Sequence, residues 1–142
     1  MDHDHCTVVF LRRSSHPVSW VISHLHPAII HFPIALFLLT ATARAFSERV
    51  PAPLIRLGLV GSIVFGLLAL VSGLLAAQPH VIPPDLILTW HLRLASLWLA
   101  CVLYLYWALD HHFPPAITTT LWIMASILLV AVGTLGGAMV HG

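Results

Sequence analysis

Charge is scarce in this sequence. Charged residues make up only 8% of its 142 residues, whereas 59% are hydrophobic, and the mean hydropathy is +0.96. A water-soluble fold would have too few polar side chains to cover its surface, so that class is excluded. All six basic residues are arginine, and five acids leave a formal net charge of +1. This balance excludes a nucleic-acid surface, and we expect an integral membrane protein whose first partner is the lipid bilayer.

Cysteine and the common enzyme motifs are also nearly absent. Cys6 and Cys101 are too far apart for a CxxC motif, and two cysteines make no disulfide framework. No GxSxG, HExxH, P-loop or paired-carboxylate pattern occurs, which argues against an independent hydrolase or ATPase. The N-terminal arginines are not followed by a long apolar core with a small-residue cleavage site, so we do not expect a removed signal peptide.

Four long apolar runs are present, and each approaches the roughly 20 residues that a helix needs to cross a bilayer core. Short proline-containing segments separate them, so neighbouring helices must be antiparallel. The predicted fold is an all-α integral membrane protein, an antiparallel up-down four-helix transmembrane bundle. Residues 1–26 are expected to form a polar tail with a short N-terminal interfacial helix. The transmembrane domain is expected at 27–142, with helices at about 28–46, 54–77, 86–109 and 117–140.

The arginines predict the orientation in the membrane. Arg44, Arg49 and Arg56 flank the first connection, whereas the segment between the second and third runs has no lysine or arginine. Side A is used here for the membrane face at which the first span begins, and side B for the opposite face. By the positive-inside rule, side B should be cytoplasmic. Both termini are then expected on the periplasmic side of a bacterial inner membrane.

Histidine is the abundant polar residue, with eleven copies. His26 and His31 begin the first apolar run, His91 lies near the start of the third, and His141 ends the fourth. In an up-down bundle these four positions come together at side A. Polar side chains inside a membrane usually face the bundle interior, and neutral imidazole binds haem iron, copper and zinc. The pattern therefore predicts a cofactor or metal site at side A.

The pair expected to bind a haem is His31 with His91, since two axial ligands must come from different helices. His26 and His141 would form a second pair or would be hydrogen-bond partners of the first. Arg93 is costly at this depth in the membrane, and a haem propionate would suit it as a partner. Pairing with Asp85 would instead make this arginine structural.

The positions of the prolines and small residues lead to further predictions. Pro27 suits a first helical turn, with His26 as a cap, and Pro33 is expected to kink the helix near His31. Gly133 and Gly137 have the GxxxG spacing that allows helices to approach closely. The second run has a similar series of small residues, which serves either ordinary helix packing or the accommodation of a flat cofactor: Gly58, Ser62, Gly66, Ala69, Gly73 and Ala76.

Three segments together resemble a bacterial membrane family catalogued as domain of unknown function 2231 (DUF2231). They are "HPAIIHFPIAL" (26–36), "WHLRLA" (90–95) and "GTLGGAMVHG" (133–142). The resemblance extends over all four runs. It implies that the recurring histidines of the family correspond to His26, His31, His91 and His141. Similar segments are joined to cytochrome c or Rieske iron-sulphur domains in relatives, which implies a redox role.

The leading hypothesis is a membrane-bound b-type cytochrome-like subunit that carries one or two molecules of haem b near the periplasmic face. It would pass electrons from a donor such as quinol to cytochrome c or a Rieske-type protein. Such a chain is a redox carrier or a subunit of an oxidoreductase complex rather than an independent enzyme. Its small-residue surfaces are compatible with a respiratory complex or a homo-oligomer.

Two alternatives stay open. The first is a copper or zinc protein that uses His26, His31, His91 and His141 as metal ligands. Met139 is the only soft ligand near that end, which favours haem over copper. The second is a structural or assembly subunit of a respiratory complex, in which the histidines only make hydrogen bonds.

Overall fold

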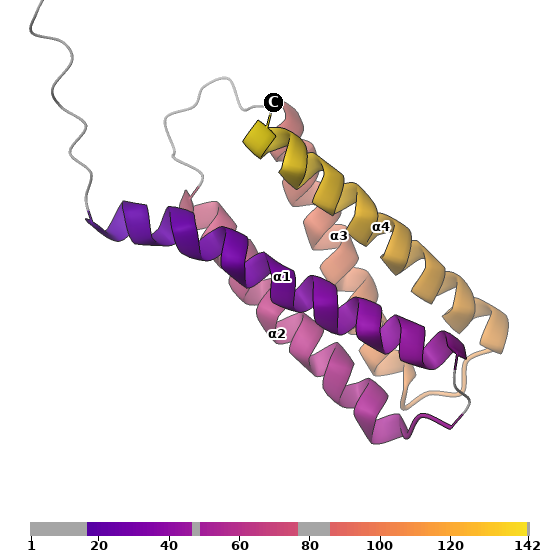
Figure 1. Cartoon of the computed structure of the whole chain (residues 1–142). Coiled ribbons are helices and arrows are strands. Elements are labelled where there is room, and N and C mark those ends of the chain that lie inside the picture. The colour runs from indigo at the N-terminus through magenta and orange to yellow at the C-terminus, as the bar shows by residue number, and fades with distance from the viewer. Residues whose placement is uncertain (1–16, 47–48, 77–85, 142) are drawn as a thin grey trace, which may run out of the picture.

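The protein folds into four long α-helices in a computed structural model (Figure 1). The structure describes residues 17–46, 49–76 and 86–141, and it describes side chains within 26–46, 49–75 and 86–139. Strands are absent from these residues. The helices are α1 (Pro17–Phe46), α2 (Ala52–Ala76), α3 (Leu86–Ala108) and α4 (Pro115–His141).

Every helix contains a segment long and apolar enough to cross a membrane, which confirms the predicted multi-pass membrane protein. The large hydrophobic side chains on the outside of the bundle, such as Leu75 at 66% exposure and Val130 at 65%, are then the lipid-facing surface. The spans contain between 21 and 25 residues: His26–Phe46, Ala52–Leu75, Leu86–Ala108 and Pro115–Met139.

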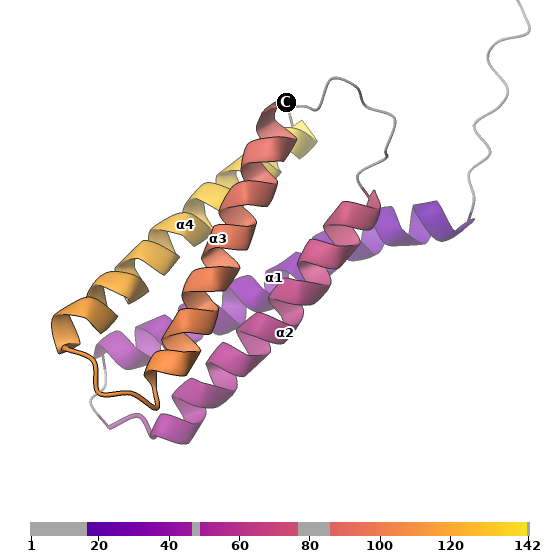
Figure 2. The same cartoon turned by 180° about the vertical axis from the view of Figure 1, so that it is seen from behind.

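The helices form two antiparallel hairpins, α1 with α2 and α3 with α4 (Figures 1 and 2). The start of α3 and the end of α4 lie together at side A, whereas the end of α1, the start of α2 and the connection between α3 and α4 lie at side B. This arrangement confirms the up-down topology. Both views also show the two hairpins diverging toward side A.

The first helix begins earlier than the sequence predicts. We expected a separate interfacial helix followed by a span from about residue 28, but α1 runs without a break from Pro17 to Phe46. Pro27 and Pro33 both lie inside it, so His26 is a residue of the helix interior and not a cap. Proline removes one backbone hydrogen bond and bends a helix, but an apolar environment favours continued helix because the remaining backbone groups must still be paired. The bend of α1 in Figure 1 fits this account.

The closely packed core lies in the half of the bundle near side B. It combines the second half of α1, the first half of α2, the second half of α3 and the first half of α4. Toward side A, the described parts of α2, α3 and α4 contain no buried residue beyond Gly66, Trp98 and Leu129. The end where the histidines lie is therefore the less tightly packed end. The largest fully buried side chains are Phe37, Leu59, Ser62, Val102 and Leu105.

Small residues of α2 allow close contact with its neighbours. A Cβ atom at Gly58 would collide with the Thr40 side chain of α1, and one at Gly66 would lie 3.1 Å from the Trp98 ring of α3. The buried hydroxyl of Thr40 donates to the Leu36 carbonyl at 2.6 Å, so it needs no partner across the interface. These glycines support the packing interpretation of the α2 series.

The GxxxG pattern of α4 behaves differently. A Cβ atom at Gly133 or at Gly137 would have nothing within 4 Å. The expectation of a close helix contact at this pair is therefore wrong within the single chain. Both glycines are on the exposed surface of α4, and the glycine of this helix that does face a neighbour is Gly136.

Candidate functional site

One histidine from each hairpin lies against the second helix of that hairpin. His26 of α1 contacts α2, and His91 of α3 contacts α4. Each imidazole is half-buried near the start of its membrane span. In each hairpin, a histidine of the first helix therefore contacts the second helix.

The proton of the His26 imidazole can be assigned from its hydrogen bonds. Its Nδ1 atom lies 2.8 Å from Ser72 Oγ, and the Ser72 hydroxyl itself donates to the Ala69 carbonyl at 3.0 Å. With the hydroxyl proton assigned to that bond, Oγ accepts from His26, and this assignment places the ring proton on Nδ1. The neutral ring then has its lone pair on Nε2.

The proton of the His91 ring is also assigned to Nδ1, because the partner of this atom is a backbone carbonyl. Its Nδ1 atom lies 3.1 Å from the backbone carbonyl oxygen of Val132. A carbonyl can only accept, so Nδ1–H of His91 is the donor, and Nε2 again carries the lone pair in the neutral ring. Metal-binding histidines are commonly held in this way, with the other ring nitrogen donating to a carbonyl or hydroxyl.

A glycine makes room for each ring. The Cβ atom of any larger residue at Gly73 would lie 3.0 Å from Cε1 of His26, and at Gly136 it would lie 3.3 Å from Cε1 of His91. Both distances are shorter than ordinary van der Waals contact. Glycine at these two positions therefore allows the imidazoles to approach the backbones of α2 and α4.

The two imidazoles belong to different hairpins, and each lies near the start of its membrane span toward side A. The hydrogen bonds of the two rings to Ser72 and to the Val132 carbonyl are both made through Nδ1. We refer to His26 and His91 as the histidine pair. It offers two neutral nitrogen ligands in the less tightly packed end of the bundle.

His31, which the sequence predicts as a ligand with His91, is placed elsewhere. Its side chain is exposed and makes no hydrogen bond to another described residue. Five residues separate it from His26, which puts the two rings about 140° apart around α1. No contact between His31 and His91 occurs among the described residues, and their pairing as haem ligands stays a prediction.

Arg93 does not approach the histidine pair. It follows His91 by two residues, or about 200° around α3, and its side chain is exposed. The guanidinium carbon lies 5.5 Å from the ring centroid of Trp90, in a cation–π arrangement. Its predicted partner Asp85 lies outside the described residues. His141 is the last residue of α4, and its side chain is also outside them.

The described part of the chain contains no group of three or more histidine, cysteine, aspartate or glutamate side chains that could hold a metal ion. The metal-site alternative with His26, His31, His91 and His141 stays a prediction, because the side chain of His141 lies outside the described residues.

The hydrogen-bond partners of the pair were not predicted from the sequence. Ser72 was not singled out, although it directly precedes Gly73 in the small-residue series of α2. A hydroxyl beside a glycine at the level of a buried histidine is a usable signal for such a partner. The Val132 carbonyl has no such signal, because a backbone acceptor leaves no mark on the side-chain sequence.

Comparisons with protein-family models, with curated proteins and with solved structures found no match to this chain. The resemblance to the DUF2231 family therefore stays a prediction that depends on the three histidine-containing segments.

Proposed function

We propose that this protein is a membrane-bound b-type cytochrome-like subunit in which His26 and His91 bind a haem between the two hairpins. The observation that carries the proposal is that both rings have the same hydrogen-bonding arrangement. Each donates Nδ1–H to an acceptor on the neighbouring helix and leaves Nε2 as a neutral ligand. When bound, the haem would supply one-electron transfer.

The residues around the pair fit a haem in three respects. The ligands come from different hairpins, as binding on opposite faces of a macrocycle requires. The surrounding end of the bundle has no close-packed core that a cofactor would have to displace. The helices beside the rings are apolar, so ionised ligands are unfavourable there and neutral imidazole is suitable.

The chain itself would orient the ligands and hold their protons. Ser72 and the Val132 carbonyl fix the ring planes and keep the proton on Nδ1, which keeps Nε2 unprotonated. Gly73 and Gly136 set how closely each ring approaches the adjacent helix. We include neither His31 nor Arg93 in the haem site.

The location of the pair defines the expected partners. Both histidines lie toward side A, which we propose to be periplasmic, so electrons would be exchanged at that face. A membrane quinol is the proposed donor and a cytochrome c or Rieske-type protein the proposed acceptor. Conduction straight across the bilayer by this chain alone is not part of the proposal, because the described histidines near side B, His111 and His112, are neighbours in one connection and are exposed.

A reduced-minus-oxidised visible spectrum tests the proposal. The full chain is expressed with ample haem and purified in detergent, beside the variants His26→Ala, His91→Ala and His31→Ala. We expect the sharp α band of a low-spin haem in the wild type and in His31→Ala. Its loss is expected in the other two variants, since each removes one axial ligand.

Each other outcome contradicts a definite part of the proposal. A wild-type spectrum without haem bands, with folded protein and ample haem supply, would overturn the haem assignment. Loss of the band in His31→Ala with retention in His26→Ala would restore the pair expected from the sequence. Stoichiometric copper or zinc in haem-free protein, lost in His31→Ala, would favour the metal-site alternative.

A further inference from the structure

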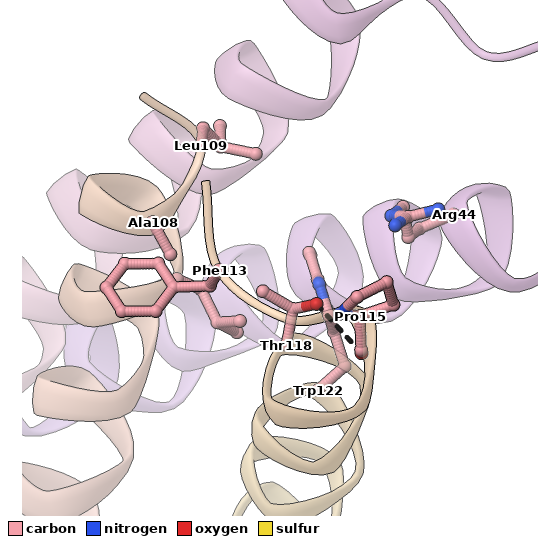
Figure 3. A pocket seen from close by; sticks show the side chains of 8 residues that line it. Arg44, Ala108, Leu109, Phe113, Pro115, Thr118 and Trp122 are labelled. Atoms are coloured by element: carbon pink, nitrogen blue, oxygen red, sulfur yellow. Dashed lines mark hydrogen bonds between the residues drawn. The ribbon is translucent and has the colours of Figure 1, made fainter. Parts of the chain in front are cut away.

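A second candidate site lies at side B, at the opposite end from the histidine pair. A cavity of about 250 Å³ opens there between α1, α3 and α4. Figure 3 shows Arg44 approaching it from α1, Ala108 and Leu109 from the end of α3, Phe113 from the connection, and Thr118 and Trp122 from α4.

The lining changes from charged to apolar with depth. Arg44 lies in the last turn of α1, close to the end of its membrane span at Phe46. Trp122 lies seven residues into α4, so it is about 10 Å deeper than Pro115 at the start of that helix. Leu105, also in the lining, is only 2% exposed. The cavity thus has a cationic rim at the membrane boundary and an apolar floor inside it.

The positive charge at the rim is not neutralised by the described part of the chain. Asp110 is the sole acid there, and both of its carboxylate oxygens accept hydrogen bonds from Arg56. Arg44 is exposed and makes no ion pair with a described residue. No described residue therefore occupies its guanidinium, which lies where an anion can approach from the membrane boundary.

We propose that this cavity binds an anionic phospholipid of the side-B leaflet, with the lipid phosphate at Arg44 and part of one acyl chain against Leu105 and Trp122. An amphiphile has the same order of charge and apolar surface as the lining. The volume is below the roughly 300 Å³ at which sites for drug-sized ligands begin, so only part of a lipid enters. A free phosphate would leave the apolar floor unused.

The net charge of the lipid matters because the described lining of the site contains an arginine and no carboxylate. Arginine near the surface of an anionic leaflet contributes about 1 kcal/mol of attraction. Bidentate hydrogen bonds from a guanidinium to a phosphate add specificity of geometry. We therefore expect phosphatidylglycerol to be preferred over phosphatidylcholine with the same acyl chains.

Lipid binding by the delipidated full chain in detergent tests the proposal. Dissociation constants for short-chain phosphatidylglycerol and phosphatidylcholine are measured by native mass spectrometry for the wild type, Arg44→Gln and Arg49→Gln. We expect phosphatidylglycerol to bind the wild type on the order of five- to tenfold more tightly, and Arg44→Gln to lose that preference. Arg49→Gln removes the same charge at the same end but outside the cavity lining, so it should change the preference less than about twofold.

A second measurement locates the acyl chain. Vesicles of phosphatidylcholine that contain acyl-brominated phosphatidylglycerol should quench part of the tryptophan fluorescence, and Trp122→Phe should remove more of this quenching than Trp90→Phe. Equal effects of the two tryptophan variants would overturn the proposed position. Equal affinity for the two lipids, or equal losses in both arginine variants, would overturn the site. Competition by inorganic phosphate as strong as by the lipid would overturn the identity of the ligand.

Discussion

His26 and Ser72 join the two helices of the first hairpin through a hydrogen bond of 2.8 Å between the imidazole Nδ1 atom and the serine hydroxyl oxygen. This bond crosses between helices, whereas the other described serine hydroxyls bond only to carbonyls of their own helix. Ser72, which is not itself a proposed ligand, thus fixes the orientation of the His26 ring.

The variant Ser72→Ala should weaken cofactor binding without unfolding the protein. It removes the acceptor for Nδ1–H of His26, so the ring loses its fixed orientation and its fixed tautomer. Loss of such a partner typically lowers metal-ligand affinity by about 10- to 100-fold, and one hydrogen bond contributes about 1 kcal/mol to stability. A haem titration followed by absorbance, together with thermal unfolding, measures both effects.

The matched control for this variant is Ser96→Ala. The Ser96 hydroxyl is exposed on α3 and donates to the Leu92 carbonyl of the same helix at 2.9 Å. It should leave haem affinity unchanged. Equal affinities for all three proteins would show that Ser72 does not position the proposed ligand.

The glycines of α4 provide an internally controlled test of the second ring. Gly136→Ala would put a Cβ atom 3.3 Å from Cε1 of His91, which forces the ring to move by a few tenths of an ångström. Gly133→Ala meets nothing within 4 Å and should only gain helix propensity, up to about 1 kcal/mol. We expect a shifted Soret band or a lower haem affinity in Gly136→Ala alone. Identical spectra for both variants would contradict the proposed contact between the ring and α4.

Much of the fold follows from the sequence for simple physical reasons. Apolar runs of membrane length, separated by short proline-containing segments, leave few arrangements other than an up-down bundle. The predicted ends of the second, third and fourth helices agree with the structure within two residues. The start of α1 does not agree, because proline at positions 27 and 33 bends this helix without ending it.

The candidate site was predicted less completely. The sequence brings His26, His31 and His91 to one end of the bundle, but the choice between His26 and His31 depends on the rotation of α1 about its axis. A helix that is apolar on all sides gives no periodic pattern from which to read that rotation. In the structure, the histidine that contacts Ser72 and Gly73 of α2 is His26, and our proposal follows that contact.

Acid should weaken the ion pair between Arg56 and Asp110 at side B. Hydrogen bonds from Arg56, together with its charge, lower the pKa of Asp110 below its ordinary value. A carboxyl group with a lowered folded-state pKa stabilises the fold above its unfolded pKa of about 3.9, and this contribution is lost as the pH falls through the folded pKa. Thermal unfolding midpoints measured from pH 6 down to about pH 2 should therefore fall more steeply for the wild type than for Asp110→Asn.

Both side chains of this ion pair are exposed, at 42% for Arg56 and 56% for Asp110. The difference in unfolding midpoint between the wild type and Asp110→Asn should therefore be small and should shrink at high salt. Parallel pH curves for the wild type and Asp110→Asn would contradict the lowered pKa.

Replacing Trp98 by phenylalanine should lower the free energy of unfolding less than the burial of this side chain suggests. Its side chain is 5% exposed, and its Nε1–H is a buried donor without a hydrogen-bond partner in the described part of the chain. Leaving a buried donor unpaired costs about 1–3 kcal/mol, so removing it offsets the volume lost in Trp98→Phe. The remaining ring can still meet Phe37, whose centroid lies 5.6 Å from that of Trp98 in an edge-to-face arrangement.

We therefore expect Trp98→Phe to change the free energy of unfolding by less than about 1 kcal/mol, whereas Trp98→Ala, which leaves a cavity beside Gly66, should cost about 3–5 kcal/mol. Unfolding of the two variants by a denaturing detergent, mixed in increasing proportion with a mild one, measures the difference. Similar large losses in both would show that the indole N–H has a partner in the folded protein. That partner would then have to be sought outside the described side chains, because the core around Trp98 supplies apolar contacts from Phe37, Gly66 and Leu99 but no acceptor for this proton.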